Sequence, residues 1–421
     1  MEQLDPFSLT GCHRFKVKST AGDLECPVRH VDTHDLLDRG QLKKRLDQLA
    51  LPTSEIEHSA RSCTDDDVSY GGQALPLTPS LNSLPAVSCP TRLWCAALGL
   101  TDNHDVLEES TEGGLEWTAT TLPAGSGYGL NGVGEISCPV VGDCLVVSLS
   151  YDNTTLAWTK TAKGRWTSAA VGDHSFTASA AECSTKSNCL IVGSEAATIA
   201  PTNPPQMVRP NPSYAIFRSD DAGRSWHRVG LPSALSTGLG GLESISCGSA
   251  VTCTTSGGDG SMFTVDGGES WSGIDLPYET DPTALACPTE HVCIGVDQAA
   301  VPDGGTPART PLVAFLSSAR GDSFTRAVIP GSTANFGIPL ISCSSPDECV
   351  IVFSTMNESG SAGQVFGYKT MDGGQSWMKL TIPKDLTDLT DIKCAPETTS
   401  CVASGESNGA FGLFGFALGP P

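Results

Sequence analysis

The chain has 421 residues, including 45 Gly and 28 Pro, and only 17% of its residues are charged. Val, Thr, Ser and Ile are dense enough for strands while helix-forming runs are few, so the composition predicts an all-β protein rich in turns. The formal net charge of -22 and the lack of any apolar run of roughly 18 residues exclude nucleic acid and the membrane as expected partners.

Residues 1–70 differ from the rest and predict a flexible or partly helical leader. They contain four of the eight His residues. One amphipathic helix is expected within residues 32–52, where Pro52 ends the pattern. Cys26, His30 and His34 recur at four-residue spacing, but a zinc finger also needs a close Cys pair, so we expect no metal there.

The leader and the cysteine count together bear on the cellular compartment in which the protein is expected. Residues 1–25 lack the basic start and apolar core of a secretory signal. The 17 cysteines, however, are typical of an oxidising environment. We therefore expect an extracellular or cell-surface protein, whose start is mis-assigned or whose export uses another route. Cys12, Cys26 and Cys63 fall outside the regular pairs described next, which predicts one free or intermolecular thiol.

From residue 71 onward a repeat organises the chain. Seven copies of a close cysteine pair run from SCPTRLWC (88–95) to KCAPETTSC (393–401), and their first cysteines are 40 to 64 residues apart. This spacing is typical of one propeller blade, and each copy contains four short strands joined by tight turns. Residues 71–421 therefore predict a seven-bladed β-propeller of four-stranded antiparallel blades.

The two ends of the chain are expected to close this ring. The last copy stops one strand short of a blade, whereas residues 71–80, GGQALPLTPS, precede the first blade and carry the LP ending typical of the fourth strands. We predict that residues 71–80 complete the seventh blade, because this pairing removes an open sheet edge.

Each cysteine pair is expected to form a disulfide, because two cysteines on adjacent antiparallel strands can face each other at bonding distance. Zinc is not expected, since zinc ribbons use C-x2-C knuckles. Each short loop gains roughly 2 kcal/mol or less from closure, so the bonds act as local staples. The predicted pairs are Cys89–Cys95, Cys138–Cys144, Cys183–Cys189, Cys247–Cys253, Cys287–Cys293, Cys343–Cys349 and Cys394–Cys401.

A turn motif, Ser/Thr-x-Asp-x-Gly-x-x-Trp, recurs between the third and fourth strands. Its carboxylate and hydroxyl can accept hydrogen bonds from turn amides, Gly takes the positive φ, and Trp fills the space under the turn. The segment TKTAKGRW (159–166) is shorter by one residue. The full copies contain Ser219, Asp221, Gly223 and Trp226; Thr264, Asp266, Gly268 and Trp271; and Thr370, Asp372, Gly374 and Trp377.

This turn resembles the Asp-box, or BNR repeat, of sialidase-like propellers. The resemblance implies that these residues are a structural signature lying away from any substrate pocket. The SCPxxxxCxxVG units are similar to those of secreted bacterial proteins related to photosystem II stability and assembly factors.

The second-third and fourth-first loops share the face opposite the disulfides, and ligands are expected there. The candidate residues on this face are Glu195, Arg209, Asp259, Asp297, Arg309 and Glu406. Calcium binding at GGDG (257–260) remains an alternative, but this segment lacks a recognisable spacing of calcium ligands, so no cofactor is assigned.

Three function classes follow from this face. A sialidase needs an arginine cluster, whereas Arg209 and Arg309 are the only arginines expected there, so this activity is disfavoured. A glycoside hydrolase needs a pair of loop carboxylates, and no pair is marked by the sequence; the xyloglucanase type also uses two propellers. The leading hypothesis is a secreted, monomeric, non-catalytic propeller that binds a protein or glycan, with the hydrolase as the alternative.

Overall fold

The structure is a computed structural model. It describes residues 13–19, 22–27, 56–60, 73–75, 81–101, 104–111, 116–123, 134–150, 154–196, 213–232, 241–257, 260–274, 276, 281–298, 310–317, 323–334, 337–356, 362–382, 386–407 and 409–417. The chain divides into two compact units, Met1–Ser69 and Tyr70–Pro421. No helix among the described residues is long and apolar enough to cross a membrane.

The first unit contains a three-stranded antiparallel sheet that the sequence did not lead us to expect. Its order is β2-β1-β3, formed by β1 (His13–Ser19), β2 (Gly22–Pro27) and β3 (Ile56–Ala60). Cys26 lies in β2, opposite Phe15 of β1. The helix expected within residues 32–52, and Cys12, His30, His34 and Cys63, lie outside the described residues.

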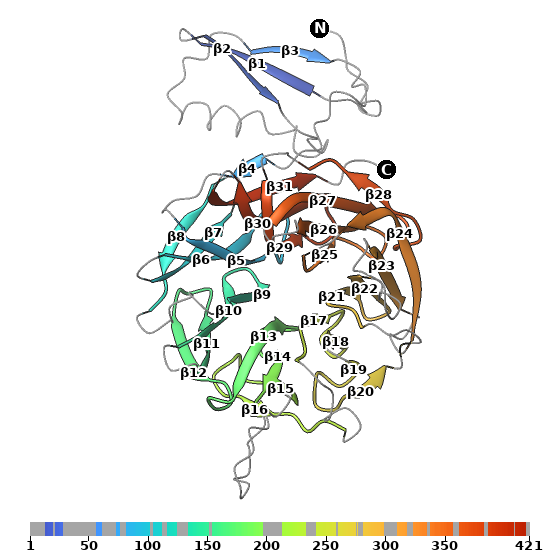
Figure 1. The fold of residues 1–421 in the computed structure, drawn as a ribbon. Coiled ribbons are helices and arrows are strands. Elements are labelled where there is room, and N and C mark those ends of the chain that lie inside the picture. Colours follow the sequence, from blue (N-terminus) through green and yellow to red (C-terminus); the bar gives the residue numbers. More distant parts are fainter. Residues whose placement is uncertain are drawn as a thin grey trace, which may run out of the picture. The chain divides into compact units, whose positions relative to one another are not determined.

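The second unit is the predicted seven-bladed propeller, formed by seven four-stranded antiparallel sheets around an axis (Figure 1). Blade 1 contains β5 (Ser83–Ser88), β6 (Cys95–Leu100), β7 (Asp105–Ser110) and β8 (Thr118–Thr121); blade 2 contains β9 (Glu135–Val140), β10 (Asp143–Leu149), β11 (Thr155–Lys160) and β12 (Trp166–Ala170). Blade 3 contains β13 (Phe176–Cys183), β14 (Cys189–Glu195), β15 (Ser213–Ser219) and β16 (His227–Arg228).

The remaining blades repeat this order from the axis outward. Blade 4 contains β17 (Ser244–Cys247), β18 (Cys253–Gly257), β19 (Gly260–Thr264) and β20 (Ser272–Ile274); blade 5 contains β21 (Ala284–Thr289), β22 (Val292–Gln298), β23 (Thr310–Ser317) and β24 (Phe324–Ala334). Blade 6 contains β25 (Leu340–Cys343), β26 (Cys349–Met356), β27 (Ala362–Thr370) and β28 (Met378–Leu380).

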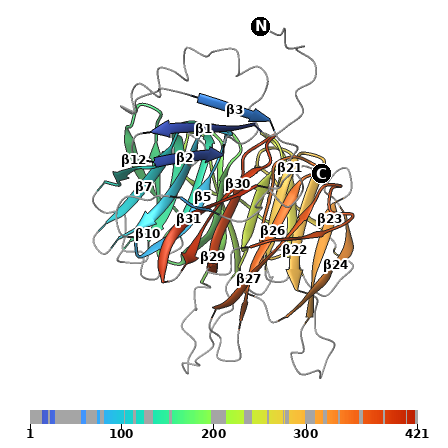
Figure 2. The ribbon, with the colours of Figure 1, turned by 90° about the horizontal axis from the view of Figure 1, so that it is seen from above.

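Blade 7 closes the ring as predicted. It contains β29 (Leu386–Cys394), β30 (Ser400–Ser407) and β31 (Ala410–Ala417), and its fourth strand is β4 (Gln73–Leu75) from before the first blade. Leu75 of β4 lies opposite Leu413 of β31. In Figure 2, β5 of blade 1 lies beside β29 and β30 of blade 7, so the first and last blades also pack against each other.

The apolar core lies between neighbouring blades. Leu145 and Val147 of blade 2, for example, form one cluster with Phe176 and Ile191 of blade 3. A strand alternates its side chains between the two faces of its sheet, so a single blade leaves two apolar faces uncovered. Each blade therefore needs a neighbour on both sides, and a closed ring supplies one to all of them.

All seven predicted disulfides are present. Each joins the end of the first strand to the start of the second, with Cα atoms 3.8 to 4.2 Å apart. Cys183 and Cys189, for example, are direct cross-strand partners. Because the connection between first and second strands is on the same side in every blade, the seven bonds share one face of the ring, here called the disulfide face.

The three full turn motifs share one hydrogen-bond arrangement. In blade 3 the hydroxyl of Ser219 accepts the amide of Gly223 at 2.8 Å, and the carboxylate of Asp221 accepts the amide of Ser225 at 2.9 Å. The equivalent Gly268 and Gly374 amides reach Thr264 and Thr370 at 3.0 and 2.8 Å, and Asp266 and Asp372 accept the amides of Ser270 and Ser376. Trp271 and Trp377 are buried beneath their turns, and Trp226 is partly buried.

A second repeated contact links the blades near the axis. The Ser hydroxyl just before a blade's first cysteine accepts the backbone amide of the first cysteine of the next blade. Ser137 accepts from Cys183 at 2.9 Å. The same bond joins Ser88 to Cys138, Ser246 to Cys287 and Ser342 to Cys394, at 2.9 to 3.0 Å. The serine of the SC dipeptide is therefore an inter-blade contact, which its position in the sequence alone did not indicate.

Candidate functional site

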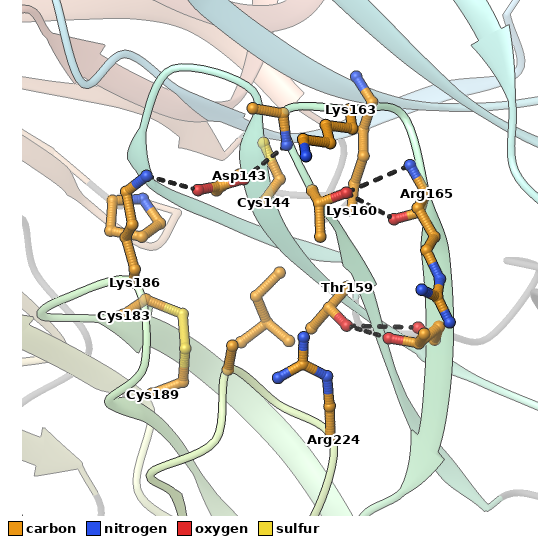
Figure 3. A pocket seen from close by; sticks show the side chains of 16 residues that line it. Asp143, Cys144, Thr159, Lys160, Lys163, Arg165, Cys183, Lys186, Cys189 and Arg224 are labelled. Atoms are coloured by element: carbon orange, nitrogen blue, oxygen red, sulfur yellow. Dashed lines mark hydrogen bonds and ion pairs between the residues drawn. A yellow bond between two sulfur atoms is a disulfide. The ribbon is translucent and has the colours of Figure 1, made fainter.

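A pocket of about 540 Å³ opens on the disulfide face between blades 2 and 3 (Figure 3). Its walls come from β10, β11 and the turn that follows β11, and from the disulfide link and the turn of blade 3. The charged residues that line it are Asp143, Lys160, Lys163, Arg165, Lys186 and Arg224. Five cations therefore converge in a chain whose net charge is strongly negative.

The pocket lies where blade 2 has a smaller residue than blades 3 and 4 have at the equivalent position. Thr159 lies opposite Leu145 in the β10–β11 pairing, and the equivalent residues are Arg218 in blade 3 and Phe263 in blade 4. Arg218 reaches the next blade, where its Nε donates to the carbonyl of Gly267 at 3.0 Å. Phe263 packs beside the disulfide of blade 5. Thr159 is too short to fill the same space.

The turn of blade 2 also departs from the motif. Lys160 occupies the position that Ser219 and Thr264 hold in blades 3 and 4, since each lies opposite the second cysteine of its blade. The Lys160 ammonium is buried and pairs with Glu109 of blade 1. Without a hydroxyl at this position the shorter turn closes through Thr161, whose amide donates to the carbonyl of Arg165 at 3.0 Å.

An ion pair between blades 2 and 3 lies at one side of the pocket (Figure 3). The Nζ of Lys186 in blade 3 lies 3.0 Å from Asp143 of blade 2. Burial disfavours the ionised carboxyl of Asp143, but its bonds to Lys186 and to the amide of Ala162 outweigh this effect and hold its pKa below the usual value. Asp143 thus stays ionised, and its charge is already matched by Lys186.

The remaining cations are available to a ligand. Lys163, Arg165 and Arg224 are exposed, and within the described part of the chain none of them has an ion-pair partner. Among the described residues, the one hydrogen bond of the Arg224 side chain is to the carbonyl of Asp221, at 3.1 Å. Figure 3 shows Arg165 and Arg224 on the side of the pocket near Thr159. Guanidinium groups bind carboxylates and phosphates in a bidentate geometry, so this arrangement suits an anionic ligand.

The rest of the lining is uncharged. Leu145 and the Cys183–Cys189 disulfide contribute its apolar part, here called the floor. Among the lining residues that the structure describes, Asp143 is the one carboxylate, and none is a His or a free thiol.

Of the six residues expected on the opposite face, the structure describes three, and these three lie on separate blades. Glu195, Asp297 and Glu406 lie near the ends of second strands on blades 3, 5 and 7, no two of which are neighbours. Glu195 forms an ion pair with Arg228, whose Nη2 lies 2.8 Å from its carboxylate. Asp297 accepts a bond from Thr283 at 3.4 Å. Arg209, Asp259 and Arg309 lie outside the described residues.

No cluster of three or more His, Cys, Asp or Glu residues suited to a metal ion occurs within the described ranges. The GGDG segment considered for calcium is described only at Gly257 and Gly260. The calcium alternative and the assignment of no cofactor thus stay predictions.

A second group of charges lies on the inner strands β9, β13 and β29, which surround the axis in Figure 1. The Nζ of Lys393 lies 3.7 Å from Asp391 on the same strand, and it interacts electrostatically with Glu135 and Glu182 of blades 2 and 3. Desolvation by burial raises the pKa of Glu135 to about 8 and that of Glu182 to about 7. The ammonium of Lys393 acts in the opposite direction and lowers both pKa values. Lys393 of blade 7 therefore interacts with carboxyl groups of two blades, 2 and 3, that are not its neighbours in the ring.

Sequence reasoning missed both charged groups, although a signal for the pocket was present. The shortened segment TKTAKGRW carries Lys160, Lys163 and Arg165 in place of the motif's hydroxyl and carboxylate. The sequence alone marks this segment only as one residue shorter than the full motif. The partners from blade 3 could not be assigned, because the sequence does not show which side chains meet between blades.

No family model and no curated protein matches the chain by sequence. Among solved structures the fold is similar to YCF48 bound to D1 peptide, with 14% identity over 83% of this chain and 96% of that one and a TM-score of 0.52. It is also similar to YCF48 from Cyanidioschyzon merolae, with 12% identity over 82% and 98% of the two chains and a TM-score of 0.53.

A third similar structure is the GH74 enzyme of Niastella koreensis, with 13% identity over 82% of this chain and a TM-score of 0.54. This chain spans only 53% of that enzyme. At such identities the likeness shows a shared fold and no shared activity. The chain is thus a seven-bladed β-propeller of the architecture found in YCF48 and in part of the GH74 enzyme.

Proposed function

We propose that this protein is a non-catalytic binding protein whose propeller holds an acidic segment of a partner protein in the pocket between blades 2 and 3. The observation that carries the proposal is the convergence of Lys163, Arg165 and Arg224, three exposed cations without an ion-pair partner among the described residues. Together with the apolar floor, they offer charge for a carboxylate and contact area for the adjoining chain.

The charge of the whole molecule strengthens this interpretation. A chain with a net charge of -22 repels most acidic partners, so a local group of cations provides an attractive site and favours one orientation of the complex. The structure of YCF48 with D1 peptide indicates that a propeller of this architecture can bind a peptide.

The proposal also covers the cellular compartment, the oligomeric state and the role of the recurring turns. Seven disulfides indicate an oxidising environment, and we place the protein outside the cell or at its surface, as a monomer. The recurring turns act as Asp-boxes in the structural sense, which is supported by their shared hydrogen bonds.

The test is peptide binding by fluorescence anisotropy. A labelled peptide of alternating Asp and Gly is expected to bind the intact chain, with an affinity that falls as salt rises, because partly exposed charges are screened. The variant Lys163→Glu/Arg165→Glu is expected to bind at least about tenfold more weakly, a change of about 1.4 kcal/mol. Arg92→Glu is the matched control, since Arg92 is an exposed cation in the disulfide link of blade 1 that does not line the pocket.

Two results would overturn the proposal. Equal binding by the Lys163→Glu/Arg165→Glu and Arg92→Glu variants would mean that the pocket is not the site. Hydrolysis of a polysaccharide by the intact chain, lost on replacing Asp297 or Glu406 by neutral residues, would instead favour the glycoside hydrolase.

A further inference from the structure

The pocket lies within a longer band of the disulfide face that has exposed apolar side chains at both ends. Val141 is 47% exposed in blade 2, and Val251 and Val265 are 47% and 63% exposed in blade 4. We call these three residues and the pocket between them the blade 2–4 band. It combines the cationic pocket with apolar side chains at its two ends. The turns of blades 3 and 4 also carry the exposed carboxylates of Asp220 and Glu269, which lie 3.8 and 3.6 Å from Arg218.

Contacts between successive blades make the band continuous. Val141 lies two residues before Asp143, which pairs with Lys186 of blade 3. From the same link of blade 3, Asn188 donates to the carbonyl of Gly267 in blade 4 at 3.1 Å. The amide of Gly267 in turn donates to the carbonyl of Val251 at 2.8 Å. Each blade of the band thus touches the next through its disulfide link or turn.

The apolar character is confined to the ends of the band. Val141 is the third residue after its blade's first cysteine and Val251 the fourth, and in blade 3 these places are held by Lys186 and Ser187. Val265 follows the motif's hydroxyl residue, where blade 3 has Asp220. Exposed single apolar residues are common, but here three of them flank one cationic pocket while the blade between them is polar.

We propose that the blade 2–4 band binds an extended protein segment with an acidic centre and an apolar side chain on each side of it. The inference rests on the proposed function and specifies its partner. Charge complementarity places the acidic residues over Lys163, Arg165 and Arg224, and the flanking apolar side chains then cover Val141 at one end and Val251 and Val265 at the other. An extended segment matches a band that crosses successive blades.

The experiment compares two peptides on the full chain. One has an acidic centre flanked by Leu on each side, and the other has the same centre flanked by Ser. We expect the Leu-flanked peptide to bind the intact chain at least about tenfold more tightly, which is about 1.4 kcal/mol and is the order expected for burying a few apolar groups. The triple variant Val141→Ser/Val251→Ser/Val265→Ser is expected to lose this difference while it still binds the Ser-flanked peptide.

The matched control is Ile338→Ser, because Ile338 is the most exposed of the described large apolar residues, at 71%, and precedes β25 at the opposite face. It is expected to bind both peptides like the intact chain. Equal affinity of the intact chain for the two peptides would overturn this inference alone. Failure of both peptides to bind would overturn the proposed function with it, and displacement of either peptide by an acidic polysaccharide at lower concentration would assign the band to a glycan.

Discussion

Gly223 of the blade 3 turn lies directly against Thr159 of blade 2: a Cβ added at Gly223 would be 2.5 Å from Thr159 Cγ2. A Cβ added at Gly268 would likewise lie 2.5 Å from Leu190, and one added at Gly374 would lie 2.5 Å from Leu316, each leucine belonging to the preceding blade. All three glycines have a positive φ, between 76 and 91°. The motif glycine is therefore needed both for the shape of its own turn and for the contact with the neighbouring blade.

Because of this double role, replacing a motif glycine by Ala is expected to destabilise the fold more than replacing a glycine that only needs a positive φ. Gly164 has a φ of 74° but no atom within 4 Å of an added Cβ, so Gly164→Ala is expected to cost about 1 kcal/mol through the backbone alone. Gly268→Ala is expected to cost about 1–3 kcal/mol more, because Leu190 has to move. Urea denaturation of the oxidised protein measures both. Equal losses would show that the turn's φ is the whole requirement.

The serine contacts between blades predict that removing such a serine lowers the stability of the fold and that adding one raises it. Ser137→Ala removes the acceptor of the Cys183 amide and is expected to destabilise the fold by about 1–3 kcal/mol, since a buried donor loses its partner. Blade 5 has Ala286 at this position, so Ala286→Ser is expected to add a bond to the amide of Cys343 and to stabilise by about 0.5–1.5 kcal/mol. A loss of thermal stability in Ala286→Ser would contradict this account.

Glu108 predicts a specific pH dependence. Its side chain is fully buried, and neither carboxyl oxygen has a hydrogen-bond partner in the described structure. Burial raises its pKa to about 7. The folded state therefore holds a proton that the unfolded state releases near pH 4.5, and the stability linked to it falls as pH rises from 4.5 to 7, by about 3 kcal/mol at most.

Glu108→Gln cannot ionise, so its stability relative to the intact chain is expected to increase across that window and to level off above it. Chemical denaturation at several pH values measures the difference. Glu195→Gln is the control, because the Glu195 carboxylate is paired with Arg228 at the surface. A constant difference between Glu108→Gln and the intact chain from pH 4.5 to 8 would refute the assignment.

Lys393 predicts coupled titrations across the ring. Its ammonium lowers the pKa of Glu135 and of Glu182 against the effect of burial. Lys393→Met is therefore expected to raise both values above about 8 and about 7, which carboxyl-carbon NMR titration of labelled Glu can follow. Lys379→Met is the control, since Lys379 lies over the ring of Phe366 and has no part in this group. Unchanged carboxyl titrations in Lys393→Met would rule out the interaction.

Local patterns determined the architecture. The seven cysteine pairs, their spacing and the missing last strand predicted the blades, the disulfides and the closure by β4. These features could be predicted because a hairpin, a short disulfide and a meander depend on residues close together in the chain. The three strands of Met1–Ser69 were missed although Phe15 and Val17 of β1 alternate with charged residues. The partner strand β3 lies far along the chain, so the local pattern did not reveal the sheet.

Only the tertiary structure decided where charges and cavities lie. The pocket depends on Thr159 of blade 2 facing Ala222 and Arg224 of blade 3, and the inner group depends on Lys393 meeting residues of blades 2 and 3. Such contacts join residues far apart in the sequence, and a repeat gives every blade the same backbone while leaving open which side chains meet between them. The sequence thus determined the seven-bladed ring. The packing of one blade on the next decided that a cationic pocket lies at the junction of blades 2 and 3.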